Sequence, residues 1–499
     1  MELKFEKTAC RCLRQIAYEV QNQEQTQELR LTDGLPDIGR ILCSWGQVIL
    51  RSKEWQDDGM SASGGIMVWV LYAPDDGSEP QCVDTWLPFQ VKWSFPETRR
   101  EGRICLTPLL RSVDARTVSA RKMMVRASIG ILGEALETGE EDLFRPGETS
   151  DGVEVLRNTY PIRLPKEVGE KTFVLDEELS LPSSCPAMEK ILHFELLPQI
   201  LDRKVMAGKV VFRGHGLLHV LYRSQSGELV GWDFEIPFSQ FGDVEEEVSP
   251  DADARMTFAV TNLELESTGE GMLRLKCGIV AQYIVDDQMM IELAQDAYGT
   301  NRAVTPYFQA LNLPALLDEH TEQISVELPL EIQCSRVVDV CFIPDHPRMN
   351  RMGDQISSEL SGMFQLLYED QDGVLQCSSK RWEKQCTFEA DYETTVNLYA
   401  IQLGSPTVSV NSGGVSVSGN VNLFARTANE RGLTMITGMD LGDVKQPDPD
   451  RPSVILRRAE GERLWDMAKS CGTSVSAISQ ANGLQSEPIL GQLLRIPVP

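Results

Sequence analysis

The side chains that could support metal binding are few in this chain and lie far apart. It has only five histidines and twelve cysteines among 499 residues. His215 and His219 stand four apart in a predicted strand and so share one face, while Cys10 and Cys12 form a C-x-C pair. A zinc site needs further ligands at short spacing, and the sequence has no C-x-x-C pair. We therefore expect no metal and no cofactor.

Catalytic motifs are also missing from the sequence. It contains no G-x-S-x-G, no phosphate-binding loop and no H-E-x-x-H, which are the short patterns that carry nucleophilic, phosphate and zinc chemistry. Its acidic neighbours, such as Glu140-Glu141, lie in polar stretches that are typical of a solvated face. We expect that the protein is not an enzyme.

The charge balance narrows the possible partners. The formal net charge is −27, whereas nucleic acids and anionic membranes attract a cationic surface. No apolar run approaches the 18 residues of a membrane span, and the first 15 residues lack the apolar core of a secretory signal. We expect a cytoplasmic protein with reduced, mostly buried thiols, without nucleic acid and without membrane insertion.

One hairpin pattern occurs three times along the chain. Tyr72 and Tyr222 are 150 residues apart, and Tyr368 follows 146 residues later. Upstream, similar segments begin at Leu31 and Leu181, again 150 apart. This constant offset over about 95 residues indicates a duplicated unit with a weaker, shortened third copy. The three hairpins read "GIMVWVLYAPDDG" from residue 65, "GLLHVLYRSQSG" from residue 216 and "GMFQLLYEDQDG" from residue 362.

Each copy reads as strand after strand. Runs rich in Val, Ile, Leu and aromatic residues end at Gly, Asp, Ser or Pro, which predicts antiparallel hairpins. The fold class is therefore mainly β, with tandem antiparallel sandwich or barrel repeats. The segments "PDIGRIL" and "PAMEKIL" are the one plausible short helix in their copies. The aromatic residues that the first two copies share are expected in their cores: Tyr72, Trp86, Phe89, Tyr222, Trp232 and Phe238.

The last part of the chain follows a different pattern. The sequence "KQPDPDRP" predicts an extended linker, and "SVILR" and "LLRIPV" beyond it predict two short strands. Between them, "ERLWDMAKSC" has helical spacing and stops at Gly472, and Thr473 or Ser474 can cap a second helix. The tail is thus β-α-α-β. The predicted units are 1–148, 149–333, a shortened 334–443, a linker at 444–452 and a tail module at 453–499.

This tail resembles a LysM module. The usual Gly-Asp-Thr-Leu-Trp, Asn-Gly-Leu and Gly-Gln-x-Leu-x-Ile-Pro segments correspond here to the stretches that begin at Gly461, Asn482 and Gly491. The resemblance implies a shallow groove between the loop before the first helix and the loop after the second, where such modules commonly bind N-acetylglucosamine chains. At its lip Glu462-Arg463 replaces the usual Asp-Thr, which favours a protein partner. The groove residues would be Gly461, Glu462, Arg463, Leu464, Asn482, Gly483, Leu484 and Ile489.

The repeats, in turn, look like the SPOCS domain of clostridial spore-coat assembly proteins, whose chains also end in a LysM module. The resemblance implies a non-enzymatic scaffold in the mother-cell cytoplasm, at the forespore surface, that engages the morphogenetic ATPase of the coat base layer. The other interpretation is a protein that binds peptidoglycan at the cell wall or spore cortex. In either case we expect Trp465 in the core of the tail module, against Ile478 and Ile496, and Arg463 at its contact surface.

Overall fold

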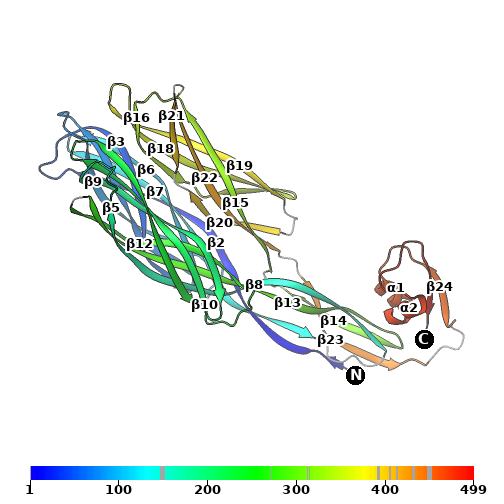
Figure 1. Ribbon diagram of the computed structural model, residues 1–499. Coiled ribbons are helices and arrows are strands. Elements are labelled where there is room, and N and C mark those ends of the chain that lie inside the picture. The colour runs from blue at the N-terminus through cyan, green and yellow to red at the C-terminus, as the bar shows by residue number, and fades with distance from the viewer. Residues whose placement is uncertain are drawn as a thin grey trace.

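The described part of the chain folds almost entirely into antiparallel strands, as predicted, with two short helices near its end (Figure 1). None of the helices in the described part of the chain is long and apolar enough to cross a membrane. A computed structural model describes residues 2–498 apart from 146–151, 270, 312, 314, 390–393, 404–405, 412–413, 430–432 and 447–451.

The first repeat consists of two three-stranded sheets that share a core. Val68 and Tyr72 from one sheet and Val125 and Ile129 from the other are all fully buried in one cluster. The strand orders are β3 (Ile38–Gln56), β4 (Gly59–Pro74), β5 (Gln81–Ser94) and β2 (Glu6–Arg30), β7 (Lys122–Arg145), β6 (Arg103–Ser119).

The second repeat has the same strand order. The Tyr72 hydroxyl donates a hydrogen bond to the carbonyl oxygen of Pro36, and Tyr222 donates to that of Pro186, both over 3.0 Å. The duplication inferred from the sequence is therefore reproduced down to single hydrogen bonds. The sheets are β9 (Met188–Met206), β10 (Lys209–Ser224), β11 (Leu229–Asp243) and β8 (Val153–Ser180), β13 (Met272–Gly299), β12 (Asp253–Gly269).

The third repeat keeps this order although two of its strands are divided. Its β15 pairs with β22, so the unit draws on residues before position 334. None of the sheets formed by the described strands closes into a barrel. One sheet contains β16 (Arg336–Pro344) and β17 (Arg348–Met352) beside β18 (Gln355–Glu369), then β19 (Leu375–Glu389); the other contains β15 (Ala315–Leu330), β22 (Gly414–Asn429), β20 (Thr394–Leu403) and β21 (Thr407–Asn411).

The predicted short helices are wrong. Both segments are the beginnings of strands, because Ile38 pairs with Pro74 and Met188 pairs with Ser224. A stretch of about seven residues is too short to be a stable helix without tertiary support, and here the neighbouring strand satisfies its backbone groups instead.

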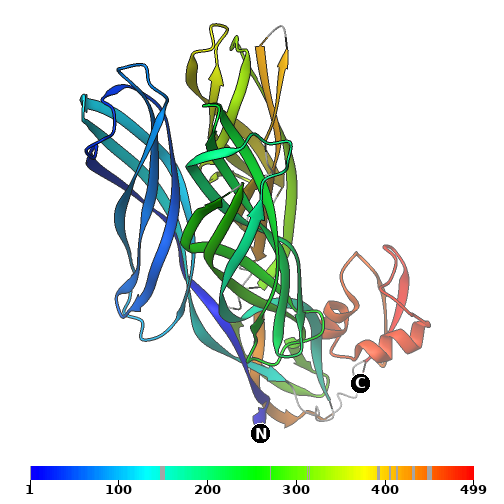
Figure 2. The ribbon, with the colours of Figure 1, turned by 60° about the vertical axis from the view of Figure 1, so that its left-hand side comes forward.

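The three repeats lie side by side (Figure 2), and the contacts between their strands close a ring. The contacts join the sheets that contain the repeated tyrosines, which are β3-β4-β5, β9-β10-β11 and β16-β18-β19. Strand β5 contacts β9, β11 contacts β16, and β19 contacts β3, so the last strand of each of these sheets meets the first strand of the next. Leu71, Leu221 and Leu367 take equivalent places before the repeated tyrosines and are buried together in one cluster, at 0%, 0% and 1% exposure. Three copies are thus what closes this arrangement.

The long strands β7, β8 and β13 continue below the repeats as a stem. The stem also includes the small sheet β1 (Glu2–Lys4), β23 (Leu433–Val444) and β14 (Arg302–Leu311). Most of the expected linker, 447–451, lies outside the described residues. The tail module follows as β24 (Val454–Arg458), α1 (Leu464–Cys471), α2 (Val475–Asn482) and β25 (Leu493–Pro497), in the predicted order.

Candidate functional site

The two loops predicted to form a groove lie next to each other in the tail module. One precedes α1 and the other follows α2, and the Leu464 N–H donates to the Glu487 carboxylate over 2.7 Å. Gly461 and Gly483 have φ angles of 95° and 61°, in the region that favours glycine. Both loop positions therefore need glycine, and Glu487, which sequence reasoning missed, connects the loops.

The charges at the lip are paired within the module. The Arg463 guanidinium donates to both carboxylate oxygens of Asp466, over 2.9 and 3.2 Å, and remains 61% exposed. Glu462 forms an ion pair with Arg457 over 3.1 Å. The most exposed groups beside the lip are instead apolar, because Ile489 is 78% exposed.

Other predicted groove residues serve the module's own structure. The Asn482 amide donates to the Ile478 and Arg495 carbonyl oxygens and accepts from the Arg495 N–H. Leu484 packs against the module core. These two side chains hold α2 against β25, and they leave Arg463 and Ile489 as the accessible predicted groups.

The tail module is docked on the stem through Trp465. This residue is 7% exposed and lies in one buried cluster with Ile478 and Ile496, in agreement with its expected place in the core. Its indole N–H, however, donates to the Asp296 carboxylate of β13 over 2.8 Å, and its ring meets Tyr298 edge to face at 4.8 Å. The Asp296 carboxylate also accepts from Lys469 over 2.7 Å, and the Tyr298 hydroxyl donates to the Thr473 carbonyl oxygen over 2.8 Å.

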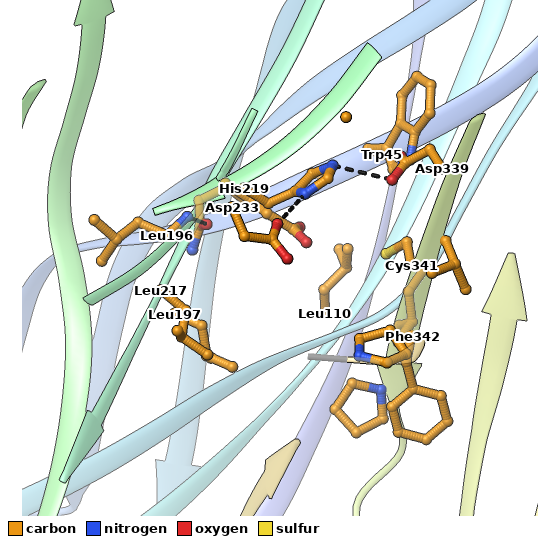
Figure 3. Close-up of a pocket in the computed structure, with 18 of the residues that line it drawn as sticks. Trp45, Leu110, Leu196, Leu197, Leu217, His219, Asp233, Asp339, Cys341 and Phe342 are labelled. Atoms are coloured by element: carbon orange, nitrogen blue, oxygen red, sulfur yellow. Dashed lines mark hydrogen bonds and ion pairs between the residues drawn. The ribbon is translucent and has the colours of Figure 1, made fainter. Parts of the chain in front are cut away.

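A cavity of about 840 Å³ lies where the three repeats meet (Figure 3). Trp45, Glu195 and Cys341 line it from equivalent positions in the first, second and third repeats. Leucine side chains and Phe342 form its apolar part, and His219 stands at its polar end.

His219 bridges two carboxylates at this polar end. Its Nδ1 lies 2.6 Å from Asp233 of its own repeat, and its Nε2 lies 3.1 Å from Asp339 of the third repeat. Burial alone would lower the pKa of His219, but Asp339 and Asp233 outweigh it and raise the pKa well above its usual value. The pKa of Asp339, which burial would raise, is lowered by His219. A charged imidazolium therefore joins the second and third repeats.

A second histidine beside it behaves in the opposite way. His193 is completely buried and stacks on Trp45 with a centroid distance of 4.8 Å. Burial, assisted by the charge of His219, lowers the pKa of His193 to about 3, so the ring is neutral. Burial also raises the pKa of Glu195, on the cavity wall, to about 7.

Such a cavity is suited to binding, because apolar walls with a few convergent polar groups are typical of ligand and side-chain pockets. In the described part of the chain, no group of three or more His, Cys, Asp or Glu side chains is arranged to hold a metal ion. Sequence reasoning missed the cavity, because repeat offsets show which residues are equivalent and not which of them meet. The 150- and 146-residue offsets that relate the tyrosines also relate Trp45, Glu195 and Cys341.

Comparison with known proteins relates part of the chain to a protein family. No curated protein and no solved structure matches the chain. The family model described as "SipL, SPOCS domain" matches residues 187–268, which hold β9, β10, β11 and nearly all of β12. Those four strands recur in the same order in the first repeat, so the family match and the internal repeat describe the same structural unit. The match supports a SPOCS-domain protein, a family associated with sporulation.

Proposed function

We propose that the protein is a non-enzymatic scaffold of spore-coat assembly that acts in the mother-cell cytoplasm at the forespore surface. Its tail module, by resemblance a LysM module, would dock the morphogenetic ATPase of the coat base layer. The observation that carries this proposal is the lip of the predicted groove. Its charges are paired internally, whereas Ile489 and Leu490 are 78% and 74% exposed, and exposed apolar groups beside a rigid lip favour a protein contact.

The rest of the chain supports a presenting role. The ring of repeats and the stem form an elongated β body with the tail module at its lower end (Figure 1). Trp465, Lys469 and Thr473 fasten this module to β13. A docking module held in one orientation loses less freedom on binding than one on a free tether.

The alternative is binding of peptidoglycan by the same groove. It is favoured by the direct contact of the two loops, which the Leu464–Glu487 hydrogen bond maintains. Under this alternative the exposed Arg463 would stand where the resemblance places a small hydroxyl residue, and Arg463→Thr would strengthen glycan binding.

The test measures binding of the full chain to the purified ATPase and, separately, its sedimentation with purified peptidoglycan. We expect the double variant Ile489→Ser, Leu490→Ser to weaken ATPase binding at least tenfold. Arg463→Ala should reduce the free energy of ATPase binding by about 2 kcal/mol. Leu456→Ser is the matched control, because Leu456 is 64% exposed on β24, outside both loops. Sedimentation with peptidoglycan in the absence of ATPase binding would establish the alternative.

A further inference from the structure

Two cysteines from different repeats face each other where the ring closes. The Sγ atoms of Cys43, on β3, and Cys377, on β19, are 2.9 Å apart although the residues are separated by 334 positions. Neither cysteine is part of a disulfide. A disulfide places its sulfurs about 2.0 Å apart, so about 1 Å of approach separates this pair from a covalent bond.

We propose that Cys43 and Cys377 are an oxidative cross-linking site, at which a disulfide covalently joins the third repeat to the first. Consecutive repeats are already joined by the chain itself, but the first and third are not. The disulfide would supply the one covalent connection that the ring lacks.

The equivalent positions in the other contacts of the ring explain why only this one can be cross-linked. Cys43, His193 and Asp339 are equivalent, since they pair with Leu71, Leu221 and Leu367. The residues on the other side of those leucines are Cys82, Gly231 and Cys377. At the contact between the third and second repeats, the equivalent residues are Asp339 and Gly231, and neither is a cysteine. At the contact between the second and first repeats they are His193 and Cys82, so only one cysteine is present.

Burial sets the order of the chemical steps. Cys43 is 3% exposed, and burial, together with its hydrogen bond to Cys377, raises its pKa well above the usual value. Cys377 is partly exposed and is thus the thiol that a low-molecular-weight disulfide can reach. The attacking species in such an exchange is the thiolate.

The exchange balances in two steps. The Cys377 thiolate attacks one sulfur of the small disulfide, forms a mixed disulfide and releases one small thiolate. Cys43 then attacks the Cys377 sulfur and expels the second small thiol, which leaves with the Cys43 proton. Overall, two protein thiols are oxidised to one disulfide, and one small disulfide is reduced to two thiols.

The test incubates the full chain with oxidised glutathione and maps its peptides under non-reducing conditions, with the remaining thiols alkylated. We expect the intact mass to fall by two hydrogens, a Cys43–Cys377 peptide to be the dominant linked species, and the rate of formation to increase with pH. The thermal unfolding midpoint should rise on oxidation and return to its original value after reduction.

Three serine variants make the assignment specific. Cys43→Ser and Cys377→Ser should lose both the linked peptide and the rise in midpoint. Cys341→Ser should keep both, although Cys341 lies at the same junction. A dominant Cys341–Cys377 linkage, cross-links only between separate chains, or glutathione retained on Cys377 in the wild-type protein would each overturn the proposal.

Discussion

Glu134 and Arg255 form a buried bidentate ion pair between the first and second repeats. The two guanidinium nitrogens donate over 2.7 and 2.8 Å, and both side chains are 5% exposed or less. Nearby, the Gln282 side chain of β13 accepts from the Leu106 N–H and donates to the Leu106 carbonyl oxygen of β6, over 3.0 and 2.8 Å. The first and second repeats are therefore joined by buried polar contacts.

Removal of one partner of this pair should be costly. Glu134→Gln removes the carboxylate that forms the bidentate pair with the buried Arg255, and we expect a loss of about 3–5 kcal/mol in the free energy of unfolding. The measurement is urea denaturation followed by tryptophan fluorescence. Glu24→Gln is the control, because Glu24 pairs with Arg126 at the surface and such pairs contribute about 1 kcal/mol or less. Equal effects of the two variants would contradict the prediction.

The repeated tyrosine hydrogen bond predicts that its removal lowers the free energy of unfolding by the same amount in the first and second repeats. Tyr72→Phe and Tyr222→Phe each leave a proline carbonyl oxygen without its donor, and each should cost about 1 kcal/mol. Equilibrium unfolding of the two variants and of their combination measures this, and the combined loss should be additive. Tyr307→Phe, which removes an exposed hydroxyl bonded to Asp440, should cost less. Unequal losses at the two repeated positions would show that their environments differ energetically.

The buried His193 predicts a loss of stability in acid. Its pKa is about 3 in the folded protein and about 6.5 when unfolded, so between these values the unfolded chain binds the extra proton. The stability due to His193 is therefore complete above pH 6.5 and falls below it, by up to about 1.4 kcal/mol per pH unit. His193→Phe retains a ring beside Trp45 and should remove this slope in urea titrations.

The stability due to Glu195 should change with pH in the opposite direction to that of His193. Its carboxylate lies 4.0 Å from His193, and its pKa is raised to about 7. A carboxyl with a raised pKa stabilises the fold when protonated, and this contribution is lost as the pH rises from 4.5 to 7. Glu195→Gln should therefore gain stability relative to the wild type over that interval, by a modest amount because the side chain keeps 33% exposure. Parallel profiles for all three proteins would show that neither group titrates as described.

The stem contact predicts how the tail module can be detached. Asp296→Ala removes the acceptor of both Trp465 and Lys469, and we expect faster hydrogen exchange in α1 and at residues 296–299 while the module stays folded. Trp465→Ala should unfold the module itself, at about 3–5 kcal/mol for a large buried side chain. Glu292→Ala, on the same strand in an exposed pair with Arg157, is the control and should leave the exchange of α1 unchanged.

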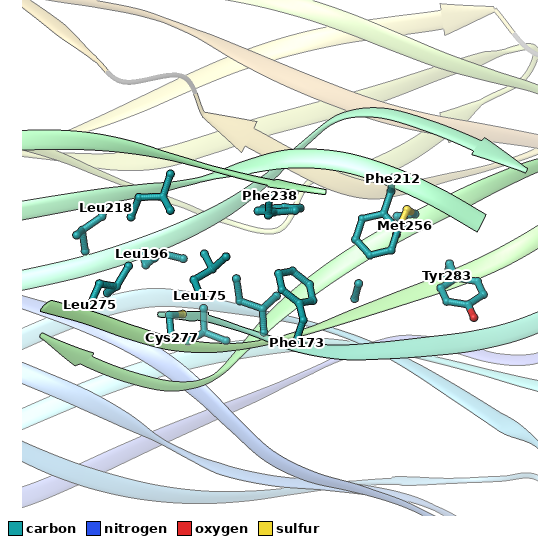
Figure 4. Packing of buried hydrophobic residues seen from close by; sticks show 14 of the residues in the cluster. Phe173, Leu175, Leu196, Phe212, Leu218, Phe238, Met256, Leu275, Cys277 and Tyr283 are labelled. Carbon is teal, nitrogen blue, oxygen red and sulfur yellow. The ribbon is translucent and has the colours of Figure 1, made fainter. Parts of the chain in front are cut away.

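The elements that local patterns specify could be predicted from the sequence. The tail module follows its capping signals, since Gly472 ends α1 with a φ of 63° and the Ser474 side chain accepts from the Ala477 N–H. Most of the aromatic residues shared by the first two repeats are buried, as expected. Tyr72, Phe89, Tyr222 and Phe238 are buried, and Phe238 lies deep in the core of the second repeat (Figure 4).

What escaped prediction depends on contacts between copies. Trp86 was expected in the core of its own repeat, yet it packs against the core of the second. Trp232 packs against the core of its own repeat, as expected, but it also borders the junction cavity. A constant sequence offset shows which residues are equivalent, but it carries no information about which copies touch. For the same reason the sequence could not reveal that Trp465 would find its hydrogen-bond partner in Asp296, 169 residues away.

The ring makes this chain the single-polypeptide counterpart of a cyclic trimer, in which the three members are no longer interchangeable. Equivalent positions in the three repeats carry different groups: the thiol of Cys43, the neutral imidazole of His193 and the carboxylate of Asp339. A closed ring has no unsatisfied face, and unlike members fix the order in which it closes. A chain shortened by one copy would keep two open faces lined by Leu71 and its counterparts. These faces would then bind repeats of other molecules and allow chains to polymerise. The covalent fusion of three copies in one chain prevents this, because it leaves neither face open.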